Sequence, residues 1–276
     1  MPATKEGRVT KSKRAQRSSG SPARRVSSVA KSLPLVERTN ALAIGDFISQ
    51  YVPSRDVMRL QGKEADRAES TADKDSRERE NNIQLDVYST ATLSGEDLEA
   101  CLDLVELTSR EDYSASSAGW SRSKKRKEMK LPEMKYLILR NTTEKADLSG
   151  QRQCEPPGDN ELENEEDTRP KILGFLSCMV TYEDGREVMY CYEIHLSHEA
   201  RGRGLGGMLM MQMEEIGRRI GLEKCMLTVF RSNTRAREFY EKGGYHVDEY
   251  SPQPRRLRNG TIKEADYLIL SKRFLP

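Results

Sequence analysis

A glycine-rich turn, Arg201-Gly202-Arg203-Gly204-Leu205-Gly206-Gly207, constrains the fold more than any other feature of the sequence. It lies between a strand-like run, Met189 to Leu196, and a helix-like run, Met208 to Ile220. Glycines let the backbone turn tightly and bring several N–H groups against a ligand without interference from Cβ atoms. The helix adds free N–H groups and roughly half a positive charge at its N-terminus, and Arg201 and Arg203 add full charges. The turn therefore indicates a site for an anion such as a pyrophosphate.

Two common glycine-rich turns do not fit this stretch. A P-loop ends in Gly-Lys-Ser/Thr, whereas Gly206 is followed by a second glycine and a methionine. Gly202, Gly204 and Gly207 satisfy the G-x-G-x-x-G dinucleotide pattern literally, but that pattern opens a βαβ unit with an acidic residue about twenty residues later. Here the turn lies late in the chain, and the strand-like run after the helix ends in Phe230-Arg231 without an acid. A simple helix-capping turn is the remaining alternative.

The turn resembles the acyl-CoA pyrophosphate loop of the GCN5-related N-acetyltransferases (GNAT), whose pattern is Arg/Gln-x-x-Gly-x-Gly/Ala. Arg201, Gly204 and Gly206 match that pattern. A second mark of the family follows downstream, where Asn233 precedes a helix-like run that carries Tyr240 and a Gly-aromatic pair. The resemblance implies an α+β fold of three layers, in which a mixed, mostly antiparallel central sheet is flanked by helices in a single domain. It also implies acetyl-CoA as the co-substrate.

Composition points to one hydrophobic core with much solvated chain, because 36% of the 276 residues are hydrophobic and 33% are charged. No apolar run approaches the roughly 18 residues that cross a membrane, and no apolar segment typical of a secretory signal opens the chain. We expect a soluble, intracellular monomer without a membrane partner. The five cysteines show no C-x-x-C spacing, and no Cys, His and carboxylate spacing is typical of a metal site. Neither a disulfide nor a metal is expected.

Charge is distributed unevenly along the chain. Residues 1–32 are rich in Lys, Arg and Ser, with Glu6 as their only acid, and are predicted to be a disordered basic tail. Such a tail suits contact with the ribosome or nucleic acid, a targeting signal, or no contact at all. Residues 33–276 are predicted to form the acetyltransferase domain, with flexible insertions at about 64–81 and 142–170. The second insertion is strongly acidic between Glu155 and Asp167.

Apolar periodicity predicts the remaining elements. A first helix is expected from about Ser32 to near Pro53, and a second after Ser94 as its N-cap. The basic stretch Ser121 to Lys130 is predicted to be a helix whose Lys124 to Lys127 run faces solvent, with an import signal as the alternative. Two further helices are expected, at Leu205 to Ile220 and Thr234 to Lys242. Strands are expected at Ile83 to Tyr88, Lys135 to Arg140, Ile172 to Tyr182, Met189 to Leu196, Lys224 to Phe230, Tyr245 to Glu249 and Ala265 to Ser271.

The strand before the glycine turn carries the best candidate for a general base. Acetyl transfer needs a group that deprotonates the amine and a proton for the leaving thiolate. Glu193 is the candidate base, directly or through a water, with a purely structural role as the alternative. Strand alternation predicts that Tyr190 and Tyr192 share one face while Cys191 and Glu193 share the other. A modest base suffices for an α-amine, whose pKa is about 7.7–8.0 against about 10.4 for lysine.

The GNAT resemblance adds roles for two later residues. Tyr240 would be the acid that protonates the CoA sulfur, and Asn233 would contact CoA. Their alternatives are a packed core aromatic and a helix N-cap.

A narrower resemblance is to the type D N-terminal acetyltransferases (NatD), and it extends from about residue 35 to 273. It is carried by Tyr190 to Ile194, Met226 to Phe230 with Asn233, Asp266 to Ser271, and Tyr113 to Met129. This family acetylates the N-terminal serine of histones four and two-A, which begin Ser-Gly-Arg-Gly-Lys. The resemblance therefore implies histone tails as partners, and the cytoplasm and nucleus as the location.

Taken position by position, the NatD resemblance also implies a set of site residues. Tyr192, Glu193 and Tyr267 would be catalytic or substrate-positioning, Tyr113, Trp120 and Tyr190 would contact the peptide, and Ile194, Leu196, Arg201, Gly202, Arg203, Gly204, Leu205 and Gly206 would hold acetyl-CoA. Glu183 and Asp184 are candidates for pairing with the substrate arginine, with ordinary turn charges as the alternative.

The sequence departs from the NatD pattern at Ala118-Gly119-Trp120, where some members have Trp-Gly-Trp. Trp120 is the candidate replacement for the missing tryptophan. Two other functions stay open at this point. One is a GNAT enzyme acting on lysine side chains or on other protein N-termini, and the other is a non-catalytic protein with a CoA fold that binds ribosomes or nucleic acid.

Overall fold

The computed structural model describes residues 33–53, 83–141 and 170–274. The predicted basic tail lies outside these ranges. The predicted insertions also lie outside them, apart from Pro170 at the end of the second.

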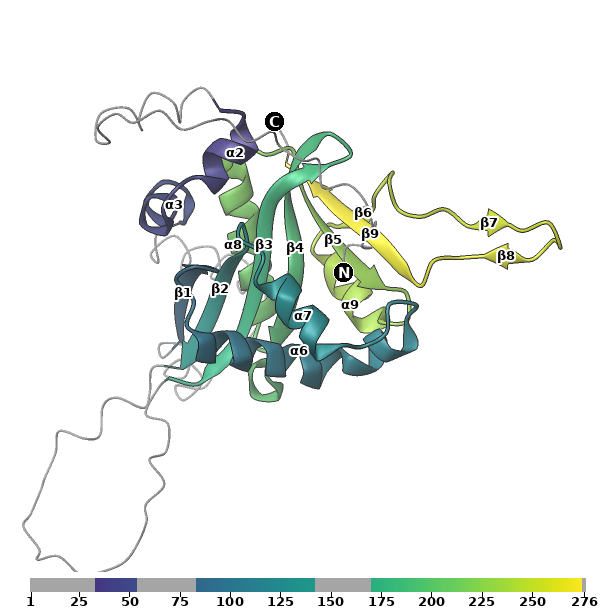
Figure 1. The fold of residues 1–276 in the computed structure, drawn as a ribbon, viewed down its shortest axis with the longest axis horizontal. Coiled ribbons are helices and arrows are strands. Elements are labelled where there is room, and N and C mark those ends of the chain that lie inside the picture. The colour runs from purple at the N-terminus through teal and green to yellow at the C-terminus, as the bar shows by residue number, and fades with distance from the viewer. Residues whose placement is uncertain (1–32, 54–82, 142–169, 275–276) are drawn as a thin grey trace, which may run out of the picture.

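A seven-stranded sheet forms the centre of the molecule, in the order β1-β2-β3-β4-β5-β9-β6 (Figure 1). Neighbouring strands are antiparallel except β4 and β5, which are parallel, so the predicted mixed and mostly antiparallel sheet is confirmed. The strands are β1 (Ile83–Ser89), β2 (Lys135–Asn141), β3 (Ile172–Glu183), β4 (Arg186–Leu196), β5 (Lys224–Phe230), β6 (His246–Val247) and β9 (Tyr267–Arg273). A two-stranded hairpin of β7 (Arg255–Arg256) and β8 (Ile262–Lys263), absent from the sequence prediction, projects from the body.

Helices cover both faces of the sheet and complete three layers. One face carries α6 (Gly95–Ala115) and α7 (Arg122–Met129), and the other carries α8 (Leu205–Ile220) with α2 (Leu35–Asn40), α3 (Ile44–Tyr51) and α9 (Thr234–Lys242). None of the helices in the described ranges is long and apolar enough to span a membrane. The described side chains also contain no group of three or more His, Cys, Asp or Glu placed to hold a metal ion.

Helix α6 begins where the sequence predicts, because the side chain of Ser94 accepts a hydrogen bond from the backbone N–H of Asp97 at 3.0 Å. Leu98, Cys101 and Leu102 recur at helical spacing and are buried against β2 and β3. The helix runs for 21 residues and buries Tyr113, near its end, against Glu193 of β4.

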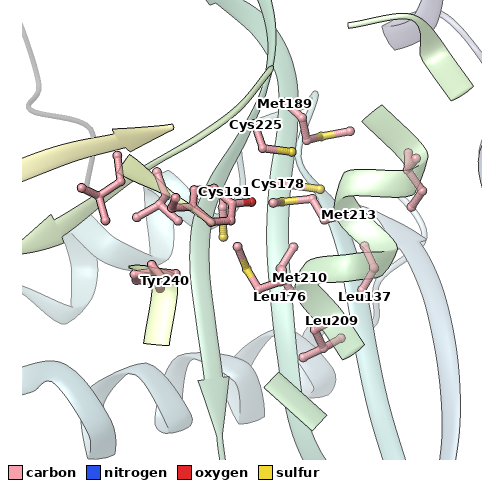
Figure 2. Packing of buried hydrophobic residues seen from close by; sticks show 14 of the residues in the cluster. Leu137, Leu176, Cys178, Met189, Cys191, Leu209, Met210, Met213, Cys225 and Tyr240 are labelled. Carbon is pink, nitrogen blue, oxygen red and sulfur yellow. The ribbon is translucent and has the colours of Figure 1, made fainter. Parts of the chain in front are cut away.

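Helix α8 lies between two glycines with left-handed backbones, Gly204 (φ 74°) and Gly221 (φ 93°). Its inward face meets methionine and cysteine side chains from the sheet, among them Cys178 and Cys191 (Figure 2). Four of the five cysteines lie in the described residues, and all four are buried free thiols.

The single helix predicted for residues 32 to 53 is wrong, since the structure has two short helices with a break after Asn40. The backbone at Ala43 is extended (φ −61°, ψ 149°), which interrupts the helical hydrogen bonds. At the break, Nδ2 of Asn40 donates to the carbonyl of Val180 in β3 at 2.9 Å. A contact from the distant strand therefore anchors the point where the chain turns.

Candidate active site

A cavity opens where β4 and β5 separate. Their pairing stops at Cys191 and Leu227, although both strands continue. Beyond that point, residues 192–196 of β4 and 228–230 of β5 line a cavity of about 650 Å³, a size typical of small-molecule sites. The backbone groups on the separated strand edges are therefore placed to bond a ligand.

The glycine turn forms one wall of this cavity. The first N–H groups of α8 have no acceptor within the helix, because they belong to its first turn. Gly202 and Gly204 have φ of 75° and 74°, a conformation that side chains with a Cβ rarely adopt. A Cβ on Gly206 would lie 3.4 Å from the Phe239 ring, and Arg201 Nε donates to the carbonyl of Leu196 at 3.2 Å. The turn is thus a fixed cradle of donors that fits a pyrophosphate.

The structure brings the predicted cofactor residues together. Every one of them except Arg203 lines the cavity, namely Ile194, Leu196, Arg201, Gly202, Gly204, Leu205, Gly206, Asn233 and Tyr240. The side chain of Asn233 is already engaged on both sides. Its Oδ1 accepts from the N–H of Ala236 at 3.0 Å and caps α9, and its Nδ2 donates to Asp112 at 3.1 Å.

Tyr240 lies at once in the core and in the cavity wall, with 8% of its surface exposed (Figure 2). Burial, followed by the neighbouring Cys191 and Glu193, raises its pKa well above the usual value. The phenol is therefore protonated at neutral pH. A protonated hydroxyl in this wall can donate to a leaving sulfur, as the predicted role requires.

A β-bulge in β4 overturns half of the predicted alternation of the catalytic strand: the Tyr190 and Tyr192 rings do lie together, with centroids 5.6 Å apart, whereas Cys191 and Glu193 do not share a face. Cys178 pairs with Cys191 and Ser177 pairs with Glu193, so Tyr192 is the extra residue. Cys191 belongs to the cluster on the α8 face, whereas Tyr192 packs on the α6 face and Glu193 bonds to side chains of α6 and α7. The bulge thus places Tyr192 and Glu193 on one face.

The carboxylate of Glu193 is held by three side chains while only 7% of the residue is exposed. Its Oε1 accepts from Lys125 Nζ at 2.5 Å and from the Tyr113 hydroxyl at 2.9 Å. Its Oε2 lies 2.6 Å from His195 Nε2. Lys125 is 1% exposed, so the predicted solvated face of α7 is wrong at this position. The helix buries Lys125 and Met129, which lie four residues apart on one side.

These contacts fix the charges of the pair. Burial would raise the pKa of Glu193, but Lys125 and His195 outweigh it and lower that pKa. Burial likewise opposes the charge on Lys125, but Glu193 and Glu128 outweigh it and raise its pKa. A carboxylate of lowered pKa binds an ammonium well and is a weak proton acceptor. The general-base role of Glu193 stays a prediction, and this environment suits an amine that loses its proton readily.

His195 continues the network from Glu193 to α6. Its Nδ1 lies 2.5 Å from the Thr108 hydroxyl, which in turn lies 2.7 Å from the carbonyl of Leu104. Both ring nitrogens are therefore engaged, and the ring is fixed beside the cavity that His195 and Thr108 help to line.

Cys191 also lines the cavity, but its thiol is unsuited to nucleophilic attack. Burial, then Cys178 and Glu193, raises its pKa well above the usual value, and the thiolate is the nucleophilic form. The site therefore favours direct transfer to the acceptor over an acetyl-cysteine intermediate.

The predicted peptide-binding residues divide into two groups. Tyr113 and Tyr192 line the cavity, whereas Trp120, Tyr190, Tyr267, Glu183 and Asp184 lie outside its wall. Some of the outer residues touch the lining. The Trp120 ring lies 5.5 Å from that of Tyr113, Tyr190 bonds Thr228 at 2.5 Å, and Tyr267 pairs with Phe230.

Three hydrogen bonds join α6 and the loop after it to the opposite side of the site. The N–H of Ser117 donates to Asp266 at 2.5 Å, just before β9. Asp112 accepts from Ser232 and from Asn233, each at 3.1 Å. The loop between α6 and α7 is thereby tied across the end of the sheet where β5 and β9 meet.

Carboxylates from three elements act on the Tyr192 hydroxyl. Burial, and then the charges of Glu128, Glu183 and Glu133, raise the pKa of Tyr192 to about 12. None of the three acids lines the cavity. The surroundings of Tyr192 beyond the cavity are therefore acidic. Asp184 lies in the exposed β3–β4 turn with a left-handed backbone (φ 48°).

Lys125, His195, Thr108 and Asp112 were missed as site residues by the sequence analysis. Lys125 sits in a run of basic residues that gives no sign of which lysine turns inward. The helical spacing of Lys125 and Met129 is the one local signal. His195, Thr108 and Asp112 meet their partners only through long-range packing of α6 on β4 and α9.

Comparison with known proteins gives one family match. Residues 133–245, which run from just before β2 to just before β6, match the model of the acetyltransferase (GNAT) family.

Solved structures to which the chain is similar include the PaiA N-acetyltransferase of Thermoplasma acidophilum in complex with coenzyme A (16% identity, 69% of this chain and 99% of that chain, TM-score 0.41). Another is the ribosomal-protein-S18-alanine N-acetyltransferase of Escherichia coli (17% identity, 69% and 94%, TM-score 0.40). A third is an acetyltransferase of Streptococcus agalactiae (12% identity, 70% and 99%, TM-score 0.46).

Proposed function

We propose that this chain, which belongs to the GNAT acetyltransferase family through residues 133–245, acetylates the α-amine of proteins that begin Ser-Gly-Arg-Gly, as histones four and two-A do. Acetyl-CoA is the donor. Two observations support this proposal: the family match of residues 133–245, and the arrangement of Glu193, Tyr192 and Tyr240 around the cavity.

The residues of the chain divide the chemistry among them. The cradle of Gly202 to Gly206 holds the pyrophosphate of the donor through backbone N–H groups, and the separated edges of β4 and β5 hold the rest of it. The Glu193 carboxylate binds the acceptor ammonium and receives its proton, directly or through water. The neutral nitrogen then attacks the thioester carbon, so that a C–N bond forms as the C–S bond breaks. Tyr240 gives its proton to the departing thiolate.

The acidic surroundings of Tyr192 carry the choice of acceptor. Glu128, Glu133 and Glu183 come from α7, the segment before β2, and the end of β3. Glu128 is paired with Lys125 at 3.0 Å, so an acceptor that brings a positive charge beyond its reacting amine, as Ser-Gly-Arg-Gly-Lys does, complements Glu133 and Glu183. The weak basicity of Glu193 supports the α-amine over lysine, because deprotonating an α-amine at neutral pH costs roughly 3–4 kcal/mol less.

A pair of peptides tests the proposal. The purified chain is incubated with acetyl-CoA and either Ser-Gly-Arg-Gly-Lys or the same peptide blocked at its α-amine. We expect acetylation of the free peptide alone, at the serine nitrogen. Equal acetylation of the blocked peptide would favour an enzyme for lysine side chains, and binding of acetyl-CoA without turnover of either peptide would favour a non-catalytic binding protein.

The proposed partners and location follow from the acceptor. Histone tails are accessible while they are synthesised and before they enter chromatin, so we place the activity in the cytoplasm and nucleus. Contact of the basic residues 1–32 with the ribosome belongs to the same proposal.

A further inference from the structure

Lys125 is a buried cation with a specific partner. It is 1% exposed and lies on α7, where the neighbouring Lys124, Arg126 and Lys127 are exposed. Its ammonium bonds Glu193 Oε1 at 2.5 Å and Glu128 Oε1 at 3.0 Å. It also lies 4.7 Å from the centre of the Tyr113 ring. Burying a lysine lowers the stability of the folded state unless its charge is paired. Glu193 and Glu128 supply that pairing for Lys125.

The ammonium of Lys125 bonds Glu193 from outside the cavity wall. Glu193 and Tyr113 line the cavity, whereas Lys125 does not. Lys125 shares Oε1 with Tyr113, whereas Oε2 bonds His195, so the ammonium holds the carboxylate without lining the cavity itself. The lysine neither meets the reacting atoms nor competes for the cavity.

We propose that Lys125 is a positioning residue, whose ammonium keeps the Glu193 carboxylate ionised and oriented toward the acyl-transfer cavity. The inference rests on the proposed function, because it assigns Lys125 a task in that reaction. It gives the buried Lys125–Glu193 pair a role in acetyl transfer in addition to packing α7 on the sheet.

Other groups near Glu193 define what the loss of Lys125 would leave behind. Tyr113 and His195 would still bond the carboxylate, at Oε1 and Oε2 respectively. The titratable or charged groups that face Glu193 are Tyr113 from α6, Lys125 and Glu128 from α7, Tyr136 from β2, Cys191 and His195 from β4, and Tyr240 from α9. Lys125 is the one permanent cation in this set of described residues. Its removal leaves a buried carboxylate beside Glu128, so the neutral acid becomes favoured.

The first experiment measures the carboxylate directly and needs no acceptor peptide. In the full-length protein labelled with ¹³C at the glutamate carboxyls, Glu193→Gln assigns the Glu193 signal. We expect this signal to stay that of an ionised carboxylate over the accessible pH range in the wild type, and to titrate at higher pH in Lys125→Met. Identical titration in the two proteins would overturn the proposal, whatever the protein acetylates.

The second experiment measures catalysis on the Ser-Gly-Arg-Gly-Lys peptide, with kcat/KM calculated on the neutral-amine concentration. We expect a flat pH profile for the wild type and for the exposed control Lys124→Met. For Lys125→Met, the value should fall by about tenfold per pH unit below the raised pKa of Glu193, and Lys125→Arg, which keeps a cation, should shift toward the wild-type profile.

Acetyl-CoA binding, measured by calorimetry, separates this effect from misfolding. Lys125→Met should bind acetyl-CoA with an affinity close to that of the wild type. Loss of activity by the same factor at every pH would show a merely structural lysine. If the wild type turned over no amine while the carboxyl titration still shifted, the proposed function would fail and the control of Glu193 by Lys125 would stand.

Discussion

Replacing Lys125 by Met should destabilise the fold far more than its position in a basic surface helix suggests. The substitution keeps most of the side-chain volume and removes the charge, so it leaves Glu193 buried at 7% exposure without its cation. Removing one partner of a buried ion pair costs about 3–5 kcal/mol of unfolding free energy. At about 2–4 °C per kcal/mol for a domain of this size, the melting temperature should fall by about 6–20 °C.

A double-mutant cycle isolates the pair. Glu193→Gln alone should cost less than Lys125→Met, because Lys125 retains Glu128 at 3.0 Å. The double variant removes both charges, so its loss should be smaller than the sum of the single losses by about 1–3 kcal/mol. Urea unfolding followed by circular dichroism, without acetyl-CoA, gives the free energies. Lys124→Met, an exposed neighbour on α7, is the control.

The pH dependence of this effect has a definite sign. The lowered pKa of Glu193 means that its stabilisation is present above the unfolded pKa of about 4.3 and is lost as pH falls through the folded value. The raised pKa of Lys125 means that its stabilisation is present below about 10.4 and is lost as pH rises further. The cost of Lys125→Met should thus rise with pH from about 4.3 to the raised pKa that Glu193 takes in the variant, and then stay constant up to about pH 10. A cost equal to that of Lys124→Met, or a double variant whose loss equals the sum, would refute this reasoning.

Three further substitutions address the donor and acceptor sides. Tyr240→Phe should lower kcat by about a hundredfold or more with little change in acetyl-CoA affinity, and an unchanged kcat would mean that water protonates the thiolate. Gly204→Ala places a Cβ on a left-handed backbone (φ 74°), so it should cost about 1–2 kcal/mol of stability and raise KM for acetyl-CoA. The control Gly207→Ala should cost no stability. Equal stability of the two variants would show that the left-handed backbone at Gly204 causes no strain with a Cβ present. Glu183→Lys should raise KM for Ser-Gly-Arg-Gly-Lys more than for the peptide with Ala in place of Arg, and equal effects on both would exclude Glu183 from recognising the arginine.

Local patterns predicted most of the fold because its elements carry their own signals. Alternation marked β1, glycines bounded α8, and the Ser94 cap placed the start of α6. The break after Asn40 was missed because its anchor, the carbonyl of Val180, lies in a distant strand. The β7–β8 hairpin was missed because its paired segments are only two residues long and all four residues are exposed, so no apolar period marks them.

The site was predicted on the donor side better than on the acceptor side. The cradle is a contiguous run, Arg201 to Gly206, whose backbone requirements are visible as glycines. The face on which Glu193 lies depends on a bulge opposite Ser177 and Cys178, and no residue within β4 announces it. The inward turn of Lys125 depends on how α7 packs, since the helix exposes the other basic residues of the same run. The positions of Glu193 and Lys125 therefore depend on long-range packing, which the local sequence does not reveal.

The role of Glu193 in acetyl transfer is tested by comparing Glu193→Gln with the wild type on Ser-Gly-Arg-Gly-Lys. The measurement is kcat/KM across pH, with acetyl-CoA affinity determined in parallel. We expect transfer to the serine nitrogen by the wild type, and for the variant a loss in kcat/KM of about a hundredfold or more with donor binding retained. Turnover by Glu193→Gln that equals the wild type at every pH would exclude Glu193 as the group that receives the proton of the acceptor amine.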